Sequence, residues 1–137
     1  MIIAACVDNA MGMAFNNRRQ SRDALLIKRL LQSAAGRTIW IHPDSAALFN
    51  LQEAGNVCIS EEFLQRAGSG DICFVETAAF ASRADVIEEI WLYRWNRAYP
   101  GDVFFPISLA QQGWKCVEKT EFSGNSHECI TEEIYKK

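Results

Sequence analysis

An acidic residue lies where a helix of this protein should be apolar, and it is the strongest candidate for catalytic chemistry in the sequence. In the helical pattern of Ser21–Ala35, the direction of Asp23 falls between those of Ile27 and Leu30, within the face that should pack on the sheet. An unpaired buried carboxylate is costly or becomes protonated. Asp23 is therefore expected to be either a cleft acid or a first-turn residue stabilised by the helix dipole.

Basic residues gather around this helix, although the chain as a whole is acidic: Arg18, Arg19, Arg22, Lys28, Arg29 and Arg37. One interpretation is a solvated helix face. The alternative is an anion site at the mouth of a cleft, with Arg18, Arg19 and Arg22 as candidates, because guanidinium groups donate paired hydrogen bonds to carboxylates and phosphates. Nucleic acid is the less favoured ligand.

A second cluster combines aromatic and basic residues: Trp91, Tyr93, Arg94, Trp95, Arg97 and Tyr99. Part of this cluster should belong to the core of a strand. Aromatic residues and arginine are also the residues that most often anchor protein interfaces. Arg94, Trp95 and Tyr99 are therefore candidates for contact with a protein partner.

Other chemistries lack the residues that they need. The only histidines are His42 and His127, and no His-x-x-x-His or Cys-x-x-Cys spacing exists to assemble a metal site. The nucleophile elbow Gly-x-Ser-x-Gly of many hydrolases is also absent. The cysteines are odd in number and are expected to be small buried residues in a reducing compartment: Cys6, Cys58, Cys73, Cys116 and Cys129.

Length and composition indicate one soluble globular domain, residues 1–137, with 49% apolar and 23% charged residues. The formal net charge of -3 gives no general attraction to nucleic acid or to an anionic membrane. The first apolar run, Met1–Val7, is too short to span a bilayer and has no basic flank, so we interpret it as a buried strand. A cytoplasmic location is expected.

Apolar runs alternate with segments of helical period. The predicted strands are Ile2–Val7, Thr38–His42, Asn56–Ser60, Asp71–Glu76 and Glu89–Asn96. The predicted helices are Ser21–Ala35, Pro43–Asn50, Glu61–Ala67 and Thr77–Ile87, with Ser21 as the N-cap and Gly36 as the stop of the first. This alternation indicates an α/β fold with a largely parallel sheet covered on both faces.

The end of the chain has a different pattern. Two strands, Trp114–Phe122 and Glu128–Tyr135, flank a short turn segment and have no helix between them. Such a pattern predicts a hairpin. The hairpin should place an antiparallel strand at the edge of the sheet.

Four stretches, in order along the chain, resemble motifs of the dihydrofolate reductase family. Val7–Met13 resembles the family's Val-Asp-x-x-Ile-Gly, and Gly36–Ile41 resembles its Gly-Lys-Thr-Val-x-Met. Gly101–Pro106 is similar to Gly-Asp-Thr-x-Phe-Pro, the most specific of the set. The end of the chain, from Trp114 through Asn125-Ser126-His127, completes the resemblance, and Asn56–Ser60 adds to it.

The resemblance implies a three-layer α/β fold and a cleft that holds a pterin beside the nicotinamide of NADPH, with the cofactor supplying the hydride. It implies that a carboxylate on the first helix binds the pterin, and Asp23 is the candidate for that catalytic role. The implied cofactor-binding positions are Gly12, Ser60, Glu76 and Thr77. The implied substrate-binding positions are Ala4, Leu26, Leu30 and Tyr93.

The chain departs from the family at the positions that bear the reaction. Asn17–Gln20 replaces the Leu-Pro-Trp motif, and without gaps the family's carboxylate position is Leu26, three residues after Asp23. Glu76-Thr77 replaces a glycine pair, so side chains and a negative charge should obstruct the pyrophosphate. Tyr93 stands where the family has threonine.

Three functions remain open at this point. The first is a dihydrofolate-reductase-like protein with a degenerate active site that binds a nucleotide, a pterin or a protein partner, with NADPH binding weak or lost. The second is an active or altered NADPH-dependent reductase that uses Asp23. The third is a structural or interaction module without a ligand.

Overall fold

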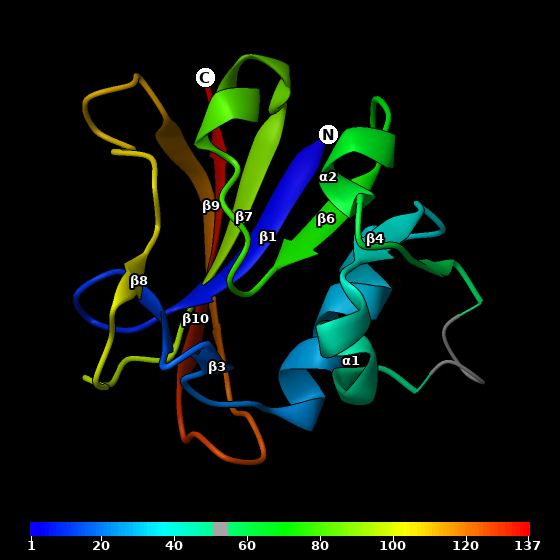
Figure 1. Ribbon diagram of the computed structural model, residues 1–137. Coiled ribbons are helices and arrows are strands. Elements are labelled where there is room, and N and C mark those ends of the chain that lie inside the picture. Colours follow the sequence, from blue (N-terminus) through cyan, green and yellow to red (C-terminus); the bar gives the residue numbers. More distant parts are fainter. Residues whose placement is uncertain (51–54) are drawn as a thin grey trace.

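The computed structural model describes residues 1–50 and 55–137. Its central sheet has seven strands in the order β5-β4-β6-β1-β7-β10-β9 (Figure 1). The bounds of these strands are β1 (Ile2–Val7), β4 (Ile39–Ile41), β5 (Val57–Ile59), β6 (Ile72–Val75), β7 (Glu89–Arg94), β9 (Lys115–Phe122) and β10 (Ile130–Lys136). All seven were predicted from the sequence, and β1 was predicted with its observed bounds.

The five strands from β5 to β7 are mutually parallel, and β10 is antiparallel to both of its neighbours. The mixed sheet with a C-terminal hairpin is thus confirmed. The hairpin lies at the edge of the sheet as expected: β10 pairs with β7, and β9 forms the edge, antiparallel to β10. The edge strand β9 is exposed along seven of its eight residues.

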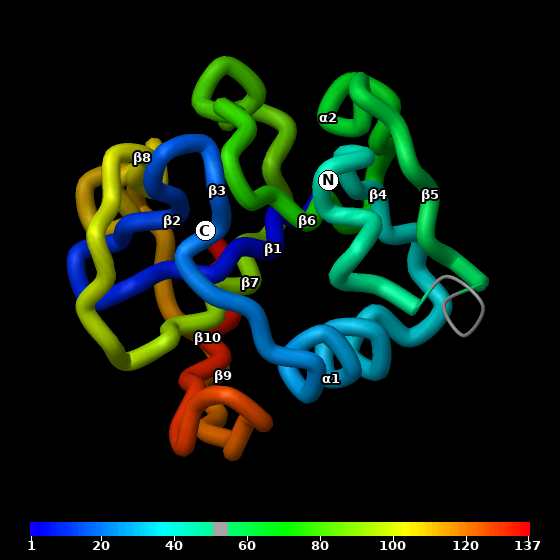
Figure 2. Tube along the Cα trace, turned by 60° about the horizontal axis from the view of Figure 1, so that its bottom comes forward, coloured from blue at the N-terminus to red at the C-terminus, as the bar shows by residue number. Residues whose placement is uncertain are grey.

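Both faces of the parallel strands are covered, as the continuous apolar sequence of β1 predicts. On one face, Ile2 and Ala4 pack with α1 (Ala24–Ala34). On the other face, Ile3 and Ala5 pack with residues of α2 (Phe63–Arg66) and of the segment that follows β8 (Val103–Phe104). Figure 2 shows α1 on its own side of the sheet, away from α2.

Helix α1 begins later than the sequence pattern suggested. Its N-cap is Asp23 and not Ser21, because the carboxylate of Asp23 accepts hydrogen bonds from the first free N–H groups of the helix. The helix ends at Ala34, its C-cap Ala35 has a left-handed φ of 50°, and Gly36 follows with φ 85°. Two other predicted helices are 3₁₀ turns, η1 (Pro43–Leu48) and η2 (Ala81–Val86).

A second, small antiparallel sheet was not foreseen. Its strands are β2 (Gly12–Phe15), β3 (Arg18–Arg19) and β8 (Val103–Phe104), in the order β3-β2-β8. Asn16 and Asn17 connect β2 to β3 with positive φ angles of 51° and 59°, the conformation that tight hairpin turns require. This turn brings Arg19 back toward the end of β6.

All five cysteines are free, but the expectation that they are buried is only partly correct. Cys73 is buried in the core, whereas Cys116 and Cys129 are exposed. Cys116 is exposed because it lies on the edge strand β9, and Cys129 belongs to the hairpin connection. In the described residues, no helix has the length and apolar character needed to cross a membrane.

Candidate functional site

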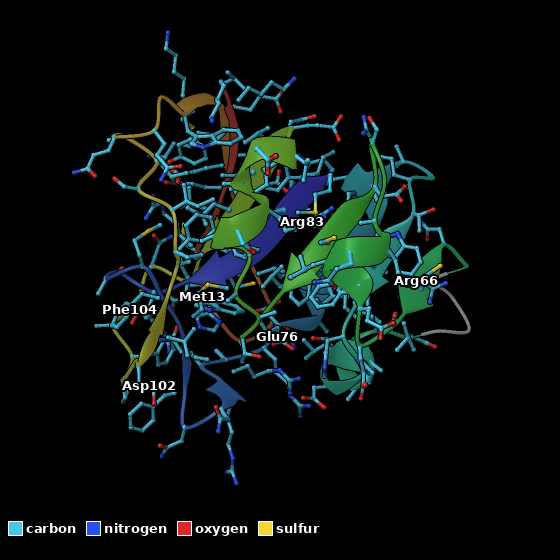
Figure 3. The ribbon with its side chains drawn as sticks, turned by 45° about the horizontal axis from the view of Figure 1, so that its top comes forward. Met13, Arg66, Glu76, Arg83, Asp102 and Phe104 are labelled. Atoms are coloured by element: carbon cyan, nitrogen blue, oxygen red, sulfur yellow. The ribbon has the colours of Figure 1, made fainter. Side chains whose placement is uncertain are left out.

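The candidate site lies beyond the carboxyl ends of the parallel strands, where open α/β sheets usually bind their ligands. Cys6, Val75 and Trp95 reach this edge from β1, β6 and the end of β7. The N-terminus of α1 and the small sheet enclose the edge from two sides. In Figure 3, Glu76 and Met13 lie close to these strand ends.

An apolar cleft opens between α1 and the strand ends. Its apolar lining consists of Cys6, Met13, Leu26, Ile27, Leu48, Phe74, Val75 and Trp95, and its polar and charged lining of Arg19, Gln20, Ser21, Arg22, Asp23 and Glu76. The volume open to the centres of water-sized molecules is only about 20 Å³. A cavity needs roughly 10–15 Å³ by this measure to hold one water molecule. The cleft is therefore nearly closed as it stands.

A second, polar cleft adjoins the first and is wide open, with about 670 Å³ by the same measure. It is lined by Asn17, Arg18, Arg19, His42, Asp44, Ser45, Phe63, Glu76, Thr77 and Ala78. Arg19 and Glu76 line both clefts. These two side chains therefore form the partition between the apolar and the polar space.

The partition is an ion pair between Arg19 and Glu76, and Ser45 donates a further hydrogen bond to Glu76. We call these three residues the clasp. Arg19 donates from Nε to Glu76 Oε2 at 2.7 Å and from Nη2 to Oε1 at 3.0 Å, and Ser45 Oγ donates to Oε1 at 2.7 Å. Arg19 Nη2 also donates to the carbonyl of Asp44. The hydrogen bond from Arg19 to Glu76 raises the pKa of the guanidinium. The clasp thus joins the small sheet, η1 and the end of β6.

Asp23 is enclosed, and its side chain has no exposed surface. Oδ1 accepts from the backbone N–H groups of Leu25 and Leu26 at 3.0 and 3.1 Å. Oδ2 accepts from the N–H of Ser126 at 2.8 Å, and Ser126 Oγ lies at the same distance. Burial raises the pKa of Asp23, but the hydrogen bonds from Ser126 outweigh it, so the pKa lies below its ordinary value.

A chain of polar contacts continues from Asp23 through the hairpin loop. Ser126 Oγ lies 2.6 Å from Nδ1 of His127, and Nε2 of His127 lies 2.7 Å from the hydroxyl of Tyr99. The His127 ring stacks on Trp95 with ring centres 4.5 Å apart. Burial lowers the pKa of His127, and so does the charge of Arg97, against the raising effect of Asp23. A neutral imidazole therefore fixes the loop against the strands.

The four implied cofactor positions are not brought together. Glu76 and Thr77 line the polar cleft, as the resemblance implies. Gly12 is buried in the small sheet, where an added Cβ would lie 2.7 Å from Gln20 Nε2. Ser60 Oγ accepts from the N–H of Glu62 before α2.

Of the four implied substrate positions, only Leu26 lines the apolar cleft. Ala4, Leu30 and Tyr93 are completely buried in the core. The hydroxyl of Tyr93 has no hydrogen-bond partner of good geometry. Burial raises the pKa of this hydroxyl, and the negative charge of Glu132 raises it further. The ring of Tyr93 therefore belongs to the hydrophobic core beneath α1.

The arginines do not form one anion site. Arg19 is held in the clasp, Arg18 is exposed at the polar cleft, and Arg22 lines the apolar cleft. Arg18 and Arg19 therefore share the polar cleft, and Arg19 and Arg22 share the apolar cleft.

The expected partner-facing residues are used within the chain. Trp95 is only 4% exposed, so its assignment to a partner surface is wrong. Arg94 pairs with Glu133, and Tyr99 contacts His127. In residues 1–50 and 55–137, no group of three or more acidic, histidine or cysteine side chains is arranged to hold a metal ion.

Sequence reasoning missed Ser45 and Ser126, which complete the two carboxylate sites. Ser45 is 2% exposed and contacts Glu76 across 31 positions of sequence, and Ser126 contacts Asp23 across 103 positions. Neither pairing leaves a local sequence signal. The only available signal for Ser126 was its place in the Asn125-Ser126-His127 stretch that carries part of the resemblance.

Comparison with known proteins identifies the fold. No protein-family model matches the chain, and no curated protein matches it by sequence. Among solved structures, dihydrofolate reductase from Enterococcus faecalis, complexed with NADP(H) and RAB-propyl, matches with a TM-score of 0.67 and 13% identity, over 98% of this chain and 94% of that chain. At this identity the likeness establishes the fold, and the dihydrofolate-reductase-like fold expected from the sequence is confirmed.

Proposed function

Since the chain has the fold of dihydrofolate reductase, we propose that it is a small-molecule-binding protein of this fold that does not reduce dihydrofolate. One observation carries the proposal: the carboxylate of Asp23 is already engaged on both oxygens, by the N–H groups of α1 and by Ser126. A carboxylate with no exposed surface and a lowered pKa neither reaches a substrate nor holds a proton to deliver to it.

The polar cleft does not fit NADPH. The resemblance implies a glycine pair where the cofactor's pyrophosphate approaches the backbone, and Glu76 and Thr77 stand there. Glu76 also places a carboxylate at the partition, where it occupies the guanidinium of Arg19, so a phosphate group would have to compete with Glu76 for that cation. A ligand without phosphate, such as a pterin, is favoured over a nucleotide by the same argument.

A second candidate is a reductase that uses Asp23, and one observation favours it. Asp23 lines the apolar cleft together with Leu26. Reduction would then require the bonds to Ser126 to open and expose the carboxylate. A role in protein interaction has less support, because Trp95 is buried.

Calorimetric titration with NADPH tests the proposal. We expect a dissociation constant above about 1 μM for the native chain. Glu76→Gly combined with Thr77→Gly removes both side chains and the carboxylate that occupies Arg19, and should tighten NADPH binding about a hundredfold. Thr77→Gly alone is the matched control, because it enlarges the cleft and leaves the charge of Glu76 in place.

Submicromolar binding by the native chain would contradict the proposal. So would a double variant that binds no more tightly than the native chain, because the two side chains would then not be what excludes the cofactor.

A further inference from the structure

The two halves of the clasp differ in how firmly the fold holds them. Glu76 directly follows the central strand β6, its side chain is 13% exposed, and Ser45 holds it independently of Arg19. Arg19 belongs to β3, a strand of two residues at the edge of the small sheet, and its side chain is 29% exposed. If the clasp opens, Arg19 is therefore the half that moves.

Opening the clasp has an asymmetric cost. Water can solvate the guanidinium of Arg19 once it swings outward, because its long side chain reaches the surface. Glu76 would remain partly buried with only Ser45 as a partner, and an uncompensated buried charge is destabilising. A ligand that replaces Arg19 must therefore bring a positive charge and a fork of N–H donors matching the two carboxylate oxygens.

The surroundings favour the same kind of ligand. Without Arg19, the charged residues of the polar cleft are Arg18, Asp44 and Glu76, which sum to a net negative charge. Behind the clasp, the walls of the other cleft are apolar.

Building on the proposed function, we propose that Glu76 is the ligand-recognising carboxylate of this protein and that Arg19 is its internal substitute for the ligand. The ligand class is an amidinium or guanidinium group attached to an apolar body. The fork replaces the Arg19 guanidinium on Glu76. The body enters the apolar cleft, which is nearly closed while the clasp is shut.

Benzamidine is a suitable probe, because it combines a planar amidinium with a small apolar ring. Benzamide and benzoate are matched probes that keep the ring and replace the cation by a neutral group or an anion. Calorimetric titration of the native chain and of Arg19→Ala should show benzamidine binding about tenfold more tightly to the variant, since one charge-assisted contact no longer competes.

Three further variants make the result specific. Lys28→Ala, which removes a cation from an exposed position of α1 outside both clefts, should bind benzamidine like the native chain. Glu76→Gln keeps the side-chain volume and should lose measurable benzamidine binding. Arg19→Gln, which still hydrogen-bonds to the carboxylate, should bind with intermediate affinity, and circular dichroism establishes that each variant is folded.

Equal affinity of benzamidine for the native chain and Arg19→Ala would overturn the inference, and so would binding that survives in Glu76→Gln. Benzoate binding to the native chain that disappears in Arg19→Ala would also overturn it, by showing that Arg19 is the receptor. Failure of the proposed function is seen separately, as submicromolar NADPH binding or dihydrofolate reduction by the native chain without benzamidine.

Discussion

Replacement of Asp23 should destabilise the fold, because this carboxylate joins the start of α1 to the hairpin loop. Asp23→Asn retains one oxygen that can accept from Leu25 and Leu26, as Oδ1 does in the native chain. Its amide NH₂ group would face the N–H of Ser126, so a donor would meet a donor. Asp23→Ala removes both sets of contacts.

The magnitudes follow from these contacts. A hydrogen bond to a charged group contributes about 1.5–3 kcal/mol, and loss of a side-chain N-cap costs about 1 kcal/mol. We therefore expect Asp23→Asn to lower the free energy of unfolding by about 2 kcal/mol and Asp23→Ala by about 3 kcal/mol. The full values apply because the Asp23 side chain is completely buried.

The effect should depend on pH in a defined direction. The folded-state pKa of Asp23 lies below its value in the unfolded chain, which is about 3.9. The stabilisation is therefore fully present above about pH 4 and is lost as the pH falls through the folded-state pKa. The difference between the native chain and Asp23→Asn should be constant from about pH 5 to 8 and should shrink below about pH 4.

Urea unfolding followed by circular dichroism at pH 7 and pH 3 measures these differences. Asp85→Asn is the matched control, since Asp85 is exposed and should change the free energy of unfolding by less than about 0.5 kcal/mol. A similarly small effect of Asp23→Asn at pH 7 would refute the structural role assigned to this carboxylate.

Three more predictions concern stability. Gly124→Ala should lower the free energy of unfolding by about 2–3 kcal/mol, because the added Cβ would lie 2.2 Å from Asp23 Oδ2. Tyr93→Phe should leave the free energy of unfolding within about 0.5 kcal/mol of the native value or raise it, because the buried hydroxyl lacks a well-aligned partner. Hydrogen bonds to Glu88, the strongest of them from the Gly70 N–H, lower the pKa of this carboxyl to about 2. Glu88→Gln should therefore destabilise the protein at pH 7, and the destabilisation should shrink as the pH falls from about 4 toward 2.

Urea unfolding measures all three, with controls from the same chain. Gly55→Ala has no atom within 4 Å of the added Cβ and should be neutral. Tyr135→Phe removes a hydroxyl that donates to Glu133 at 2.9 Å and should cost about 1 kcal/mol. A neutral Gly124→Ala, a Tyr93→Phe that costs as much as Tyr135→Phe, or a pH-independent effect of Glu88→Gln would each contradict its prediction.

The sequence predicts the central sheet well because its signal is local. The continuous apolar run of β1 reflects burial on both faces, and the periodic apolar residues of α1 reflect burial on one. The small sheet could not be predicted in this way. Its strand β3 has two residues, and β2 is held by β8, which lies about ninety positions later in the chain.

The candidate site was only partly predictable for the same reason. The sequence indicated that Asp23 needed a partner or a helix end, and the structure provides both. It also indicated that Glu76 alters the cofactor region. The partners Ser126 and Arg19 come from distant segments, and only the folded chain brings them into contact.

The most direct test of the proposed function is NADPH oxidation in the presence of dihydrofolate, measured by absorbance for the purified native chain and for Asp23→Asn. We expect no oxidation above background in either protein, because Asp23 is committed to Ser126 and Glu76 obstructs the cofactor. Robust turnover by the native chain that disappears in Asp23→Asn would contradict this and establish a reductase that uses Asp23. Turnover that persists in Asp23→Asn would equally contradict it and assign the acid to another residue.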